Sequence, residues 1–407
     1  MTPDVESTEG PKARSDGRPI GLGIAGLGMA GAVMVQAAAA HPGYVLRAAA
    51  DPHPGPRQAF ARDFAARTYA DVSELCADPE VEVIYVATPH QFHTPHAIMA
   101  AERGKHVILE KPMALTLADC DTIIAATQRS NVWLIVGHTH AFDPAVRLMR
   151  TMIASGDLGR LGMINSFNYT NFLYRPRRPE ELDTSKGGGI LFNQVPHQID
   201  TVRLLAGGLV RSVRAHASVL DPARPTEGSC MALLQFDNGA SASLTYSGYD
   251  HFDSDEWHFG LSERGVPKQL SHGAARRALE SVKEETGLRT RNYAYGSSQA
   301  GLPPHQPHFG ITIVTCADGD MRASANGVTV YDRNGIQEVA IPPSPGMAGR
   351  HEVLDDMLAA LHHGRRPVND GRWGKATVEV ALAILRSARE GREVTLEHQV
   401  AVDDLSR

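Results

Sequence analysis

Three polar residues stand at spacings of four and three in the stretch GGGILFNQVPHQID, residues 187–200. On a helix, side chains three and four residues apart lie on one face, so Asn193, His197 and Asp200 could point the same way. Histidine exchanges protons near neutral pH, which makes His197 a candidate acid or base. The proline of this stretch is tolerated in a first helical turn, so a helix starting near Gln194 would make Asn193 its N-cap. We expect His197 to transfer a proton, Asn193 to cap or orient, and Asp200 to support the structure.

Two further motifs follow apolar runs that predict buried strands. ATPH ends at His90 and is followed by His93, and EKP begins at Glu110. Ligands of open α/β sheets bind outside the carboxyl ends of the strands, so both motifs should border a cofactor. Lys111 could stay charged beside an anion, or lose its proton on burial and act as a base. The alternative is that Glu110 and Lys111 form a solvated pair at a turn.

A dinucleotide signal lies near the start of the chain. The run 20–25 leads into Gly26-Leu27-Gly28-Met29-Ala30-Gly31, which fits G-x-G-x-x-G between a strand and a helix. Such glycines let backbone N–H groups approach a pyrophosphate at a helix N-terminus. The next predicted strand ends at Asp51, whose carboxylate would bind the adenosine ribose and repel a 2′-phosphate. This predicts NAD, and Arg57 leaves NADP as the alternative.

The first part of the chain alternates apolar runs with amphipathic segments. Strands are predicted at 20–25, 44–50, 82–87, 106–109 and 132–136, with helices at 30–41, 56–65, 94–103 and 116–130. Strict alternation predicts a doubly wound Rossmann sheet, and we assign residues 20–140 to an NAD-binding domain.

After that the pattern changes. Helices are predicted at 143–155 and ending near 205, then strands at 210–219, 229–236, 240–248 and within 309–341, and closing helices at 348–362 and 372–390. Turns such as Asp237-Asn238-Gly239 indicate antiparallel pairing. Residues 141–407 should therefore form an α+β domain for substrate binding and oligomerisation, with a large, mostly antiparallel open sheet. The polar stretch 250–306 suggests a functional loop or lid.

The whole chain has 407 residues, with 40 basic and 46 acidic side chains, a net charge of −6 that does not favour nucleic acid. Its four cysteines lie far apart, as in a reducing cytoplasm, and no apolar run reaches the roughly 20 residues of a membrane span. Residues 1–19 predict a disordered tail. The histidines and acids at 251–258 and 305–308 lack metal-ligand spacing, so we expect no catalytic metal.

These motifs, in this order, make the chain similar to the Gfo/Idh/MocA oxidoreductase family. The resemblance rests on GLGMAG, ATPHQFH, LEKPMAL, VGHTHAFDP, GGGILFNQVPHQID and the closing GRWGKATVEVALAILRSAREGREV. It implies a Rossmann domain followed by a sheet domain, with Lys111 and His197 at the reacting carbon. It also implies homodimers or homotetramers formed through the open sheet. Asn193 stands where many members carry aspartate, and His138-Thr139-His140-Ala141 where many carry arginine, which suggests a different substrate.

Within that family the chain looks most like the phthalate 4,5-cis-dihydrodiol dehydrogenases, because of GHTHAFDP, YRPRRPEELD and the long loop after Tyr249. This resemblance implies oxidation of cis-4,5-dihydro-4,5-dihydroxyphthalate to 4,5-dihydroxyphthalate in phthalate degradation, a pathway of aromatic catabolism. Arginine suits bidentate binding of the two carboxylates, although Arg-Pro-Arg-Arg-Pro could equally be an exposed loop. The expected substrate-binding residues are Tyr174, Arg175, Arg177, His138 and His140. The expected cofactor-binding residues are Gly26, Gly28, Met29, Ala30, Gly31, Asp51, Thr88, Pro89, His93, Glu110 and Lys111.

Two other functions remain open from the sequence. One is a sugar or cyclitol dehydrogenase on the same fold, which would present carboxamides and carboxylates to its substrate. The other is a regulator that senses NAD without turnover. A regulator would need neither Lys111 nor His197.

Overall fold

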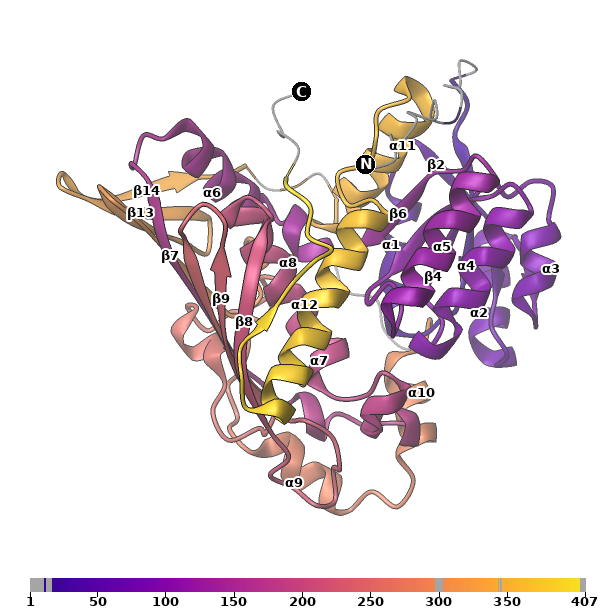
Figure 1. The fold of residues 1–407 in the computed structure, drawn as a ribbon. Coiled ribbons are helices and arrows are strands. Elements are labelled where there is room, and N and C mark those ends of the chain that lie inside the picture. The colour runs from indigo at the N-terminus through magenta and orange to yellow at the C-terminus, as the bar shows by residue number, and fades with distance from the viewer. Residues whose placement is uncertain (1–10, 12–16, 297–302, 343, 345, 403–407) are drawn as a thin grey trace.

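Two β-sheets organise the protein, as the computed structural model shows (Figure 1). It describes residues 11, 17–296, 303–342, 344 and 346–402. The predicted disordered tail, residues 1–19, lies mostly outside the described residues. The fold class predicted from the sequence is confirmed: a parallel Rossmann sheet precedes a larger, mostly antiparallel sheet.

The first sheet has six parallel strands in the order β3-β2-β1-β4-β5-β6. They are β1 (Ile20–Ala25), β2 (Tyr44–Ala50), β3 (Arg67–Tyr69), β4 (Val83–Val86), β5 (His106–Glu110) and β6 (Leu134–Gly137). Apolar runs form the central strands because helices cover both faces of a parallel sheet. The five predicted strands are confirmed within about two residues, whereas the three-residue β3 was missed.

Helices of the first domain are α1 (Met29–Ala39), α2 (Pro54–Phe64), α3 (Val72–Ala77), α4 (His93–Glu102) and α5 (Leu117–Arg129). The sequence analysis did not predict α3, a single short helix capped by Asp71. Helix α11 (Arg350–His363) comes late in the chain but packs into this same core, where Val353, Leu354 and Met357 are buried.

The second sheet has nine strands in the order β14-β13-β12-β11-β7-β10-β9-β8-β15, and only β7 and β10 pair in parallel. They are β7 (Leu161–Tyr169), β8 (Val210–Ser218), β9 (Ser229–Phe236), β10 (Ser241–Ser247), β11 (Ile311–Cys316), β12 (Gly319–Ala323), β13 (Gly327–Asp332), β14 (Gly335–Ala340) and β15 (Val394–Thr395). The central strand β7 was not predicted.

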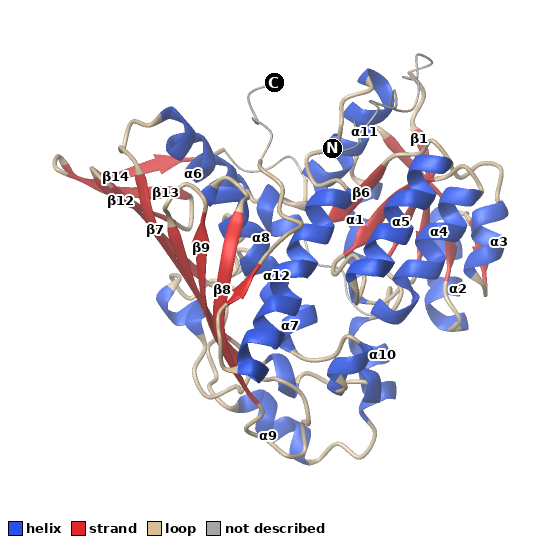
Figure 2. Ribbon diagram, in the orientation of Figure 1, coloured by secondary structure: helices blue, strands red, loops and turns tan. Residues whose placement is uncertain are grey.

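Helices α6 (Pro144–Ser155), α8 (Val195–Ala206) and α12 (Gly371–Glu390) pack on the second sheet (Figure 2). Helix α12 lies between the domains, since it contacts both β8 and α5 (Figure 1). A four-residue helix, α7 (Ile190–Asn193), precedes α8. These two helices carry the polar motif at 187–200 between the sheets.

The polar stretch 250–306 is not a structureless loop in its described part. It contains helices α9 (Ala274–Glu280) and α10 (Glu285–Tyr293), while residues 297–302 lie outside the description. The four cysteines are buried and unpaired. Among the described residues, no helix combines the length and apolar character that crossing a bilayer requires.

Candidate active site

The turn from β1 to α1 has the shape that a pyrophosphate needs. Gly26 has a positive φ of 96°, and a Cβ on Gly31 would lie 1.9 Å from the Gly26 oxygen, so both positions require glycine. A Cβ on Gly28 would meet no atom within 4 Å. Gly28 is also the N-cap of α1 and offers no capping side chain, so no side chain of Gly28 competes for the N–H groups of Met29 and Ala30 at the helix start. These residues fit a bound dinucleotide.

Asp51, at the end of β2, is tied to this turn. Its Oδ2 accepts the Leu27 N–H at 2.8 Å and its Oδ1 accepts the His53 N–H at 2.8 Å. Each carboxylate oxygen keeps a further lone pair for a ribose hydroxyl. Arg57 donates from Nη1 to the main-chain oxygens of Asp51, at 2.5 Å, and Pro52, at 3.0 Å, so its guanidinium is held against the backbone.

His93 holds together the loops that follow β4 and β5. Its Nδ1 lies 2.8 Å from the Pro112 oxygen and its Nε2 lies 2.9 Å from the Thr88 oxygen. The ring is buried. Both ring nitrogens already face carbonyl groups, so His93 holds the two loops together, and its contact with the cofactor stays a prediction. Thr88 in turn pairs with His96, and Pro89 starts the turn that follows.

Lys111 reaches across from β5 to the second domain. Its Nζ donates to the main-chain oxygen of Asn193 at 2.5 Å. The neighbouring Glu110 is buried, where it accepts the Lys111 N–H at 3.1 Å and a hydrogen bond from the Tyr85 hydroxyl. A solvated pair at a turn is thereby ruled out. Burial lowers the pKa of Lys111, and the charge of Glu110 opposes that shift.

Asn193 does not cap α8, contrary to one prediction. It is the last residue of α7, and Gln194 occupies the N-cap position without a capping side-chain bond. The Asn193 side chain instead donates to the oxygens of Gly187, at 3.0 Å, and Gly189, at 2.7 Å. The Asn193 side chain thus fixes the glycine turn while its own main-chain oxygen accepts from Lys111, which fits the predicted orienting role.

His197 lies in the first turn of α8, beside the other histidines of the site. Its ring meets that of His140 edge to face, with centroids 4.7 Å apart, and lies 4.7 Å from the Phe309 ring. Its Nδ1 is buried without a partner in the described structure. Burial lowers the pKa of His197 well below 6.5, and the charges of Lys111 and His140 add to this shift. A neutral imidazole is the form that accepts a proton.

His140 lies between two carboxylates. Its Nδ1 is 2.7 Å from Asp143 Oδ2 and its Nε2 is 3.2 Å from Glu263 Oε1. Although burial opposes the charge, these partners raise the pKa of His140 to about 9. Both ring nitrogens of His140 thus have carboxylate partners within the chain, and its contact with substrate stays a prediction. Sequence reasoning missed Glu263, because it lies in the polar stretch 250–306 with no motif around it.

His138 is buried deeper in the protein than His140 and His197. The ring is buried, neither nitrogen has a hydrogen-bond partner, and Asp200 Oδ1 lies 3.9 Å from its Nδ1. Burial lowers the pKa of His138 to about 3. Asp200 accepts a hydrogen bond from Trp373 Nε1 in α12 and has the structural role predicted for it. His138 is almost fully buried, and its contact with substrate stays a prediction.

The arginine-rich segment divides into residues with different partners. Arg177 is buried, stacks on the Phe172 ring at 3.7 Å, and donates to the Phe172 oxygen and Glu181. The Tyr174 hydroxyl donates to Asp221 at 2.6 Å. Both side chains thus have partners within the chain, and their contact with substrate stays a prediction. Arg175 is different: its Nε donates to Asn171 at 2.9 Å, and no carboxylate within the described chain pairs with its guanidinium.

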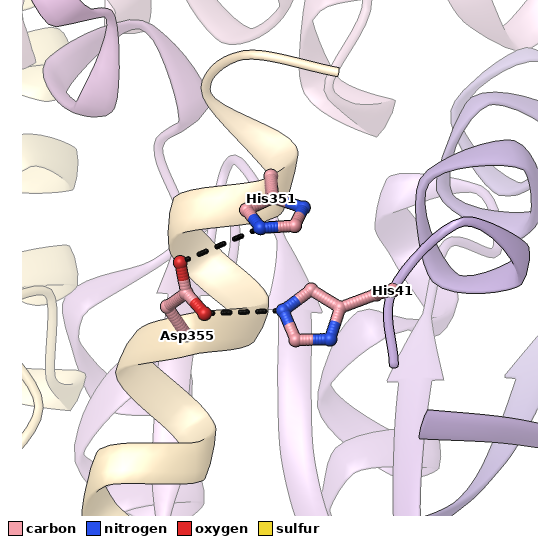
Figure 3. Close-up of side chains that lie close together, drawn as sticks. All are labelled: His41, His351 and Asp355. Atoms are coloured by element: carbon pink, nitrogen blue, oxygen red, sulfur yellow. Dashed lines mark hydrogen bonds and ion pairs between the residues drawn. The ribbon is translucent and has the colours of Figure 1, made fainter. Parts of the chain in front are cut away.

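His41, His351 and Asp355 form a separate group (Figure 3). His41 precedes the first residue of β2, and the other two residues lie on α11, so the group is at the amino-terminal end of the parallel strands. His41 Nε2 is 3.1 Å and His351 Nε2 is 3.8 Å from the Asp355 carboxylate. His41 Nδ1 accepts the Gly43 N–H at 3.0 Å, so the neutral ring carries its proton on Nε2. A metal bound to Nε2 would require the ring proton to move to Nδ1, where it would face the Gly43 N–H. We therefore assign no metal to this group.

Comparison with known proteins decides the family. The model of the oxidoreductase family with an NAD-binding Rossmann fold matches residues 20–138, and that of the Gfo/Idh/MocA C-terminal domain matches residues 146–261. The chain belongs to the Gfo/Idh/MocA family. This member is therefore an oxidoreductase that uses NAD, and its Rossmann domain is the cofactor domain.

Among relatives of this Gfo/Idh/MocA protein is the 1-carboxy-3-chloro-3,4-dihydroxycyclohexa-1,5-diene dehydrogenase of Comamonas testosteroni. It is 41% identical over 381 residues, which cover 90% of this chain and 94% of the relative. A crystal structure of a candidate dehydrogenase from Bordetella bronchiseptica RB50 is 44% identical, with a TM-score of 0.89, and covers 93% of this chain and 100% of its own. The WlbA dehydrogenase from Bordetella pertussis, solved with NADH and UDP-GlcNAcA, is 22% identical with a TM-score of 0.69, covers 95% of this chain and 99% of its own, and shares the fold.

Proposed function

We propose that this protein oxidises a cis-dihydrodiol that carries ring carboxylates, cis-4,5-dihydro-4,5-dihydroxyphthalate, to 4,5-dihydroxyphthalate with NAD. The observation that carries the proposal is the relative from Comamonas testosteroni, whose name gives a carboxylated dihydroxycyclohexadiene as substrate and which matches 90% of this chain. The adjacency of Lys111 and His197 supports it, because oxidation of an alcohol needs a proton acceptor and a cation near the oxygen.

The reaction removes a hydride from a ring C–H and a proton from its hydroxyl group. Bound NAD supplies the hydride acceptor. His197, held neutral by its surroundings, accepts the hydroxyl proton. Lys111, whose Nζ already donates to a carbonyl oxygen, stabilises negative charge on the substrate oxygen. The ketone that forms tautomerises to a catechol, and the gain of aromaticity draws the reaction forward.

A ring carboxylate needs a cation, and Arg175 is the residue that the site offers. Its charge lowers the pKa values of Glu263 and Tyr246, so it lies within electrostatic reach of both. Glu263 contacts His140, and Tyr246 donates to Gln194, the residue after Asn193, at 3.2 Å. The guanidinium is thus near the catalytic pair and has no carboxylate partner of its own in the described chain.

A second candidate is the substrate in the relative's name, a chlorinated diol with one carboxylate. The transfers of hydride and proton at carbon 4 would be the same, but carbon 3 of this diol carries the chlorine and a hydroxyl and no hydrogen, so its ketone cannot tautomerise to a catechol. The two substrates also differ in the number of carboxylates. Formation of NADH should be followed by its absorbance, with NAD and a panel of substrates. The panel holds cis-diols of phthalate and of chlorobenzoate, a cis-diol without a carboxylate, cyclitols and aldoses. Turnover of cyclitols or aldoses alone would overturn the proposal.

Arg175→Gln tests carboxylate recognition directly. We expect it to raise KM for the carboxylated diol about tenfold or more, with little change for a diol without a carboxylate, since hydrogen bonds to charged groups contribute about 1.5–3 kcal/mol. Arg178→Gln is the matched control, because Arg178 lies in the same segment and pairs with Glu180 and Glu181. An equal rise in KM for both substrates would show that Arg175 shapes the site without binding the carboxylate.

A further inference from the structure

Residues 285–296, which we call the strap, connect the substrate domain to the turn that binds the cofactor. The strap comprises α10 and the three residues after it. Its first residue, Glu285, is held by Arg224, with contacts of 2.8 Å and 3.0 Å, and accepts the Arg177 N–H at 2.8 Å. Arg224 is buried, so this ion pair is a fixed anchor in the substrate domain.

One turn later, a second contact holds the strap to the same domain. Arg289 Nη2 lies 2.7 Å from Glu181 Oε1, and its Nη1 donates to the Pro176 oxygen at 3.3 Å. Glu181 also pairs with the buried Arg177. The helix is polar and has no apolar face of its own, so these tertiary contacts are what place it.

The other end of the strap docks on the Rossmann domain. The Tyr295 N–H donates to the main-chain oxygen of Leu27 at 2.9 Å. The Tyr295 ring packs against Phe60 and Phe64 of α2, with centroids 6.0 Å and 6.2 Å away, and its hydroxyl donates to Asp63 at 3.0 Å. Aromatic packing and two hydrogen bonds thus fasten a residue from the substrate domain's sequence onto the cofactor domain.

Leu27 is the second residue of the motif that cradles the pyrophosphate. Its N–H is held by Asp51, and its C=O is held by Tyr295. Because a dinucleotide is bound through the backbone of this turn, the direction of each peptide unit decides how well its N–H groups meet the phosphates. One of the two hydrogen bonds that fix Leu27 therefore comes from a segment anchored in the other domain.

We propose that Tyr295 is a positioning residue for NAD, and that the strap couples the conformation of the cofactor turn to the substrate domain. The residues act on cofactor binding, whichever substrate the enzyme takes. A strap fastened at both ends holds the turn in the shape that binds the dinucleotide. Loosening either end lets the turn relax, and the cofactor is then bound less tightly.

The experiment measures the Kd of NADH by its fluorescence in the full-length protein without substrate. Tyr295→Ala removes the ring packing, and we expect Kd to rise about tenfold, within the range typical of coupling between sites. Tyr295→Phe removes only the bond to Asp63 and should have a smaller effect. Arg291→Ala is the control, because Arg291 is exposed on the same helix.

Glu285→Gln is the decisive variant, because it leaves every contact at Leu27 intact and loosens only the distant anchor. We expect its Kd for NADH to rise severalfold, with faster hydrogen exchange at residues 26–31 in the cofactor-free protein. Unchanged Kd and exchange in Glu285→Gln, or an effect equal to that of Arg291→Ala, would overturn the coupling. Since no substrate is present, either result stands apart from the proposed reaction.

Discussion

The charge of His140 depends on the two carboxylates that contact its ring. A neutral imidazole carries one N–H, yet both nitrogens of His140 face carboxylate oxygens, so the structure favours the charged ring. The pKa of His140 is raised to about 9, above its ordinary 6.5. Protonation therefore stabilises the fold fully below pH 6.5, and this contribution is lost as the pH rises through 9.

Glu263→Gln should lower the pKa of His140. The free energy of unfolding should then decrease less between pH 7 and pH 9.5 than it does in the unmodified protein. Nitrogen chemical shifts of the ring and thermal unfolding across that range would measure both effects. Glu256→Gln removes an exposed pair with His272 from the same segment and serves as the matched control. If His140 titrates near 6.5 in the unmodified protein, the ion pairs of protonated His140 with Asp143 and Glu263 do not exist.

Lys111 and His197 are predicted to carry the chemistry, although Lys111 is also expected to border the cofactor. Lys111→Ala and His197→Ala should each lower kcat about a hundredfold or more, as loss of a general base or of charge stabilisation does. Both variants should still bind NADH, because the pyrophosphate turn is formed by other residues. Unchanged turnover in either variant would remove that residue from the mechanism.

The candidate site was only partly predictable at the residue scale. The family resemblance implied that Lys111 and His197 act together, and in the structure Lys111 donates to Asn193 while its charge acts on His197. Residues of one short segment, however, have unrelated environments: Arg177 is buried against Phe172, whereas Arg175 has no carboxylate partner in the described chain. Spacing in the sequence of an irregular segment cannot predict which side chain is buried, because tertiary contacts determine each environment.

At the scale of elements, the turn from β1 to α1 allows a matched test. Gly28→Ala should leave thermal stability within about 0.5–1 kcal/mol and weaken NAD binding, because its Cβ enters only the open space that a pyrophosphate would approach. Gly31→Ala should lower the melting temperature, since its Cβ would lie 1.9 Å from the Gly26 oxygen. Unchanged NADH affinity in Gly28→Ala would mean that the cofactor does not pass over this glycine.

Elements with a clear apolar pattern were predictable, and those stabilised by their surroundings were not. Strand β7 lies at the centre of the second sheet, yet its buried face includes Ser166 and Asn168, which hide the apolar alternation. Strand β3 has three residues and no apolar run. Helix α10 is polar and is placed by the ion pairs of Glu285 and Arg289.

At the scale of the whole molecule, helices late in the sequence pack against the domain that is formed first in the chain. Helix α11 completes the core of the first domain, and α12 joins the two domains by packing on α5 and β8. Asp200 of the substrate domain bonds Trp373 of α12 close to His138. Helix α12 therefore packs against the buried side of the site, where residues of the two domains meet.

The open face of the second sheet carries the last prediction, which concerns assembly. Met163 on β7 is 42% exposed, and Met231 and Leu233 on β9 are 64% and 46% exposed. Strand β10 lies between these strands, and Met163 pairs with Ser241, which pairs with Gln235, so the three side chains share one face of the sheet. Apolar side chains gathered on one sheet face favour a second copy of the chain as the partner, in a symmetric pair. We expect light scattering to give a mass that is a multiple of 43.9 kDa.

The double variant Met231→Lys/Leu233→Lys should shift that mass toward a single chain, because two buried charges per subunit would have to be desolvated at the interface. Leu220→Lys is the control, since Leu220 is 68% exposed but lies beyond the end of β8. Turnover of the dissociated variant should persist, because the described contacts of Lys111, His197 and the cofactor turn lie within one chain. An unchanged mass in the double variant would place the subunit contact on another surface.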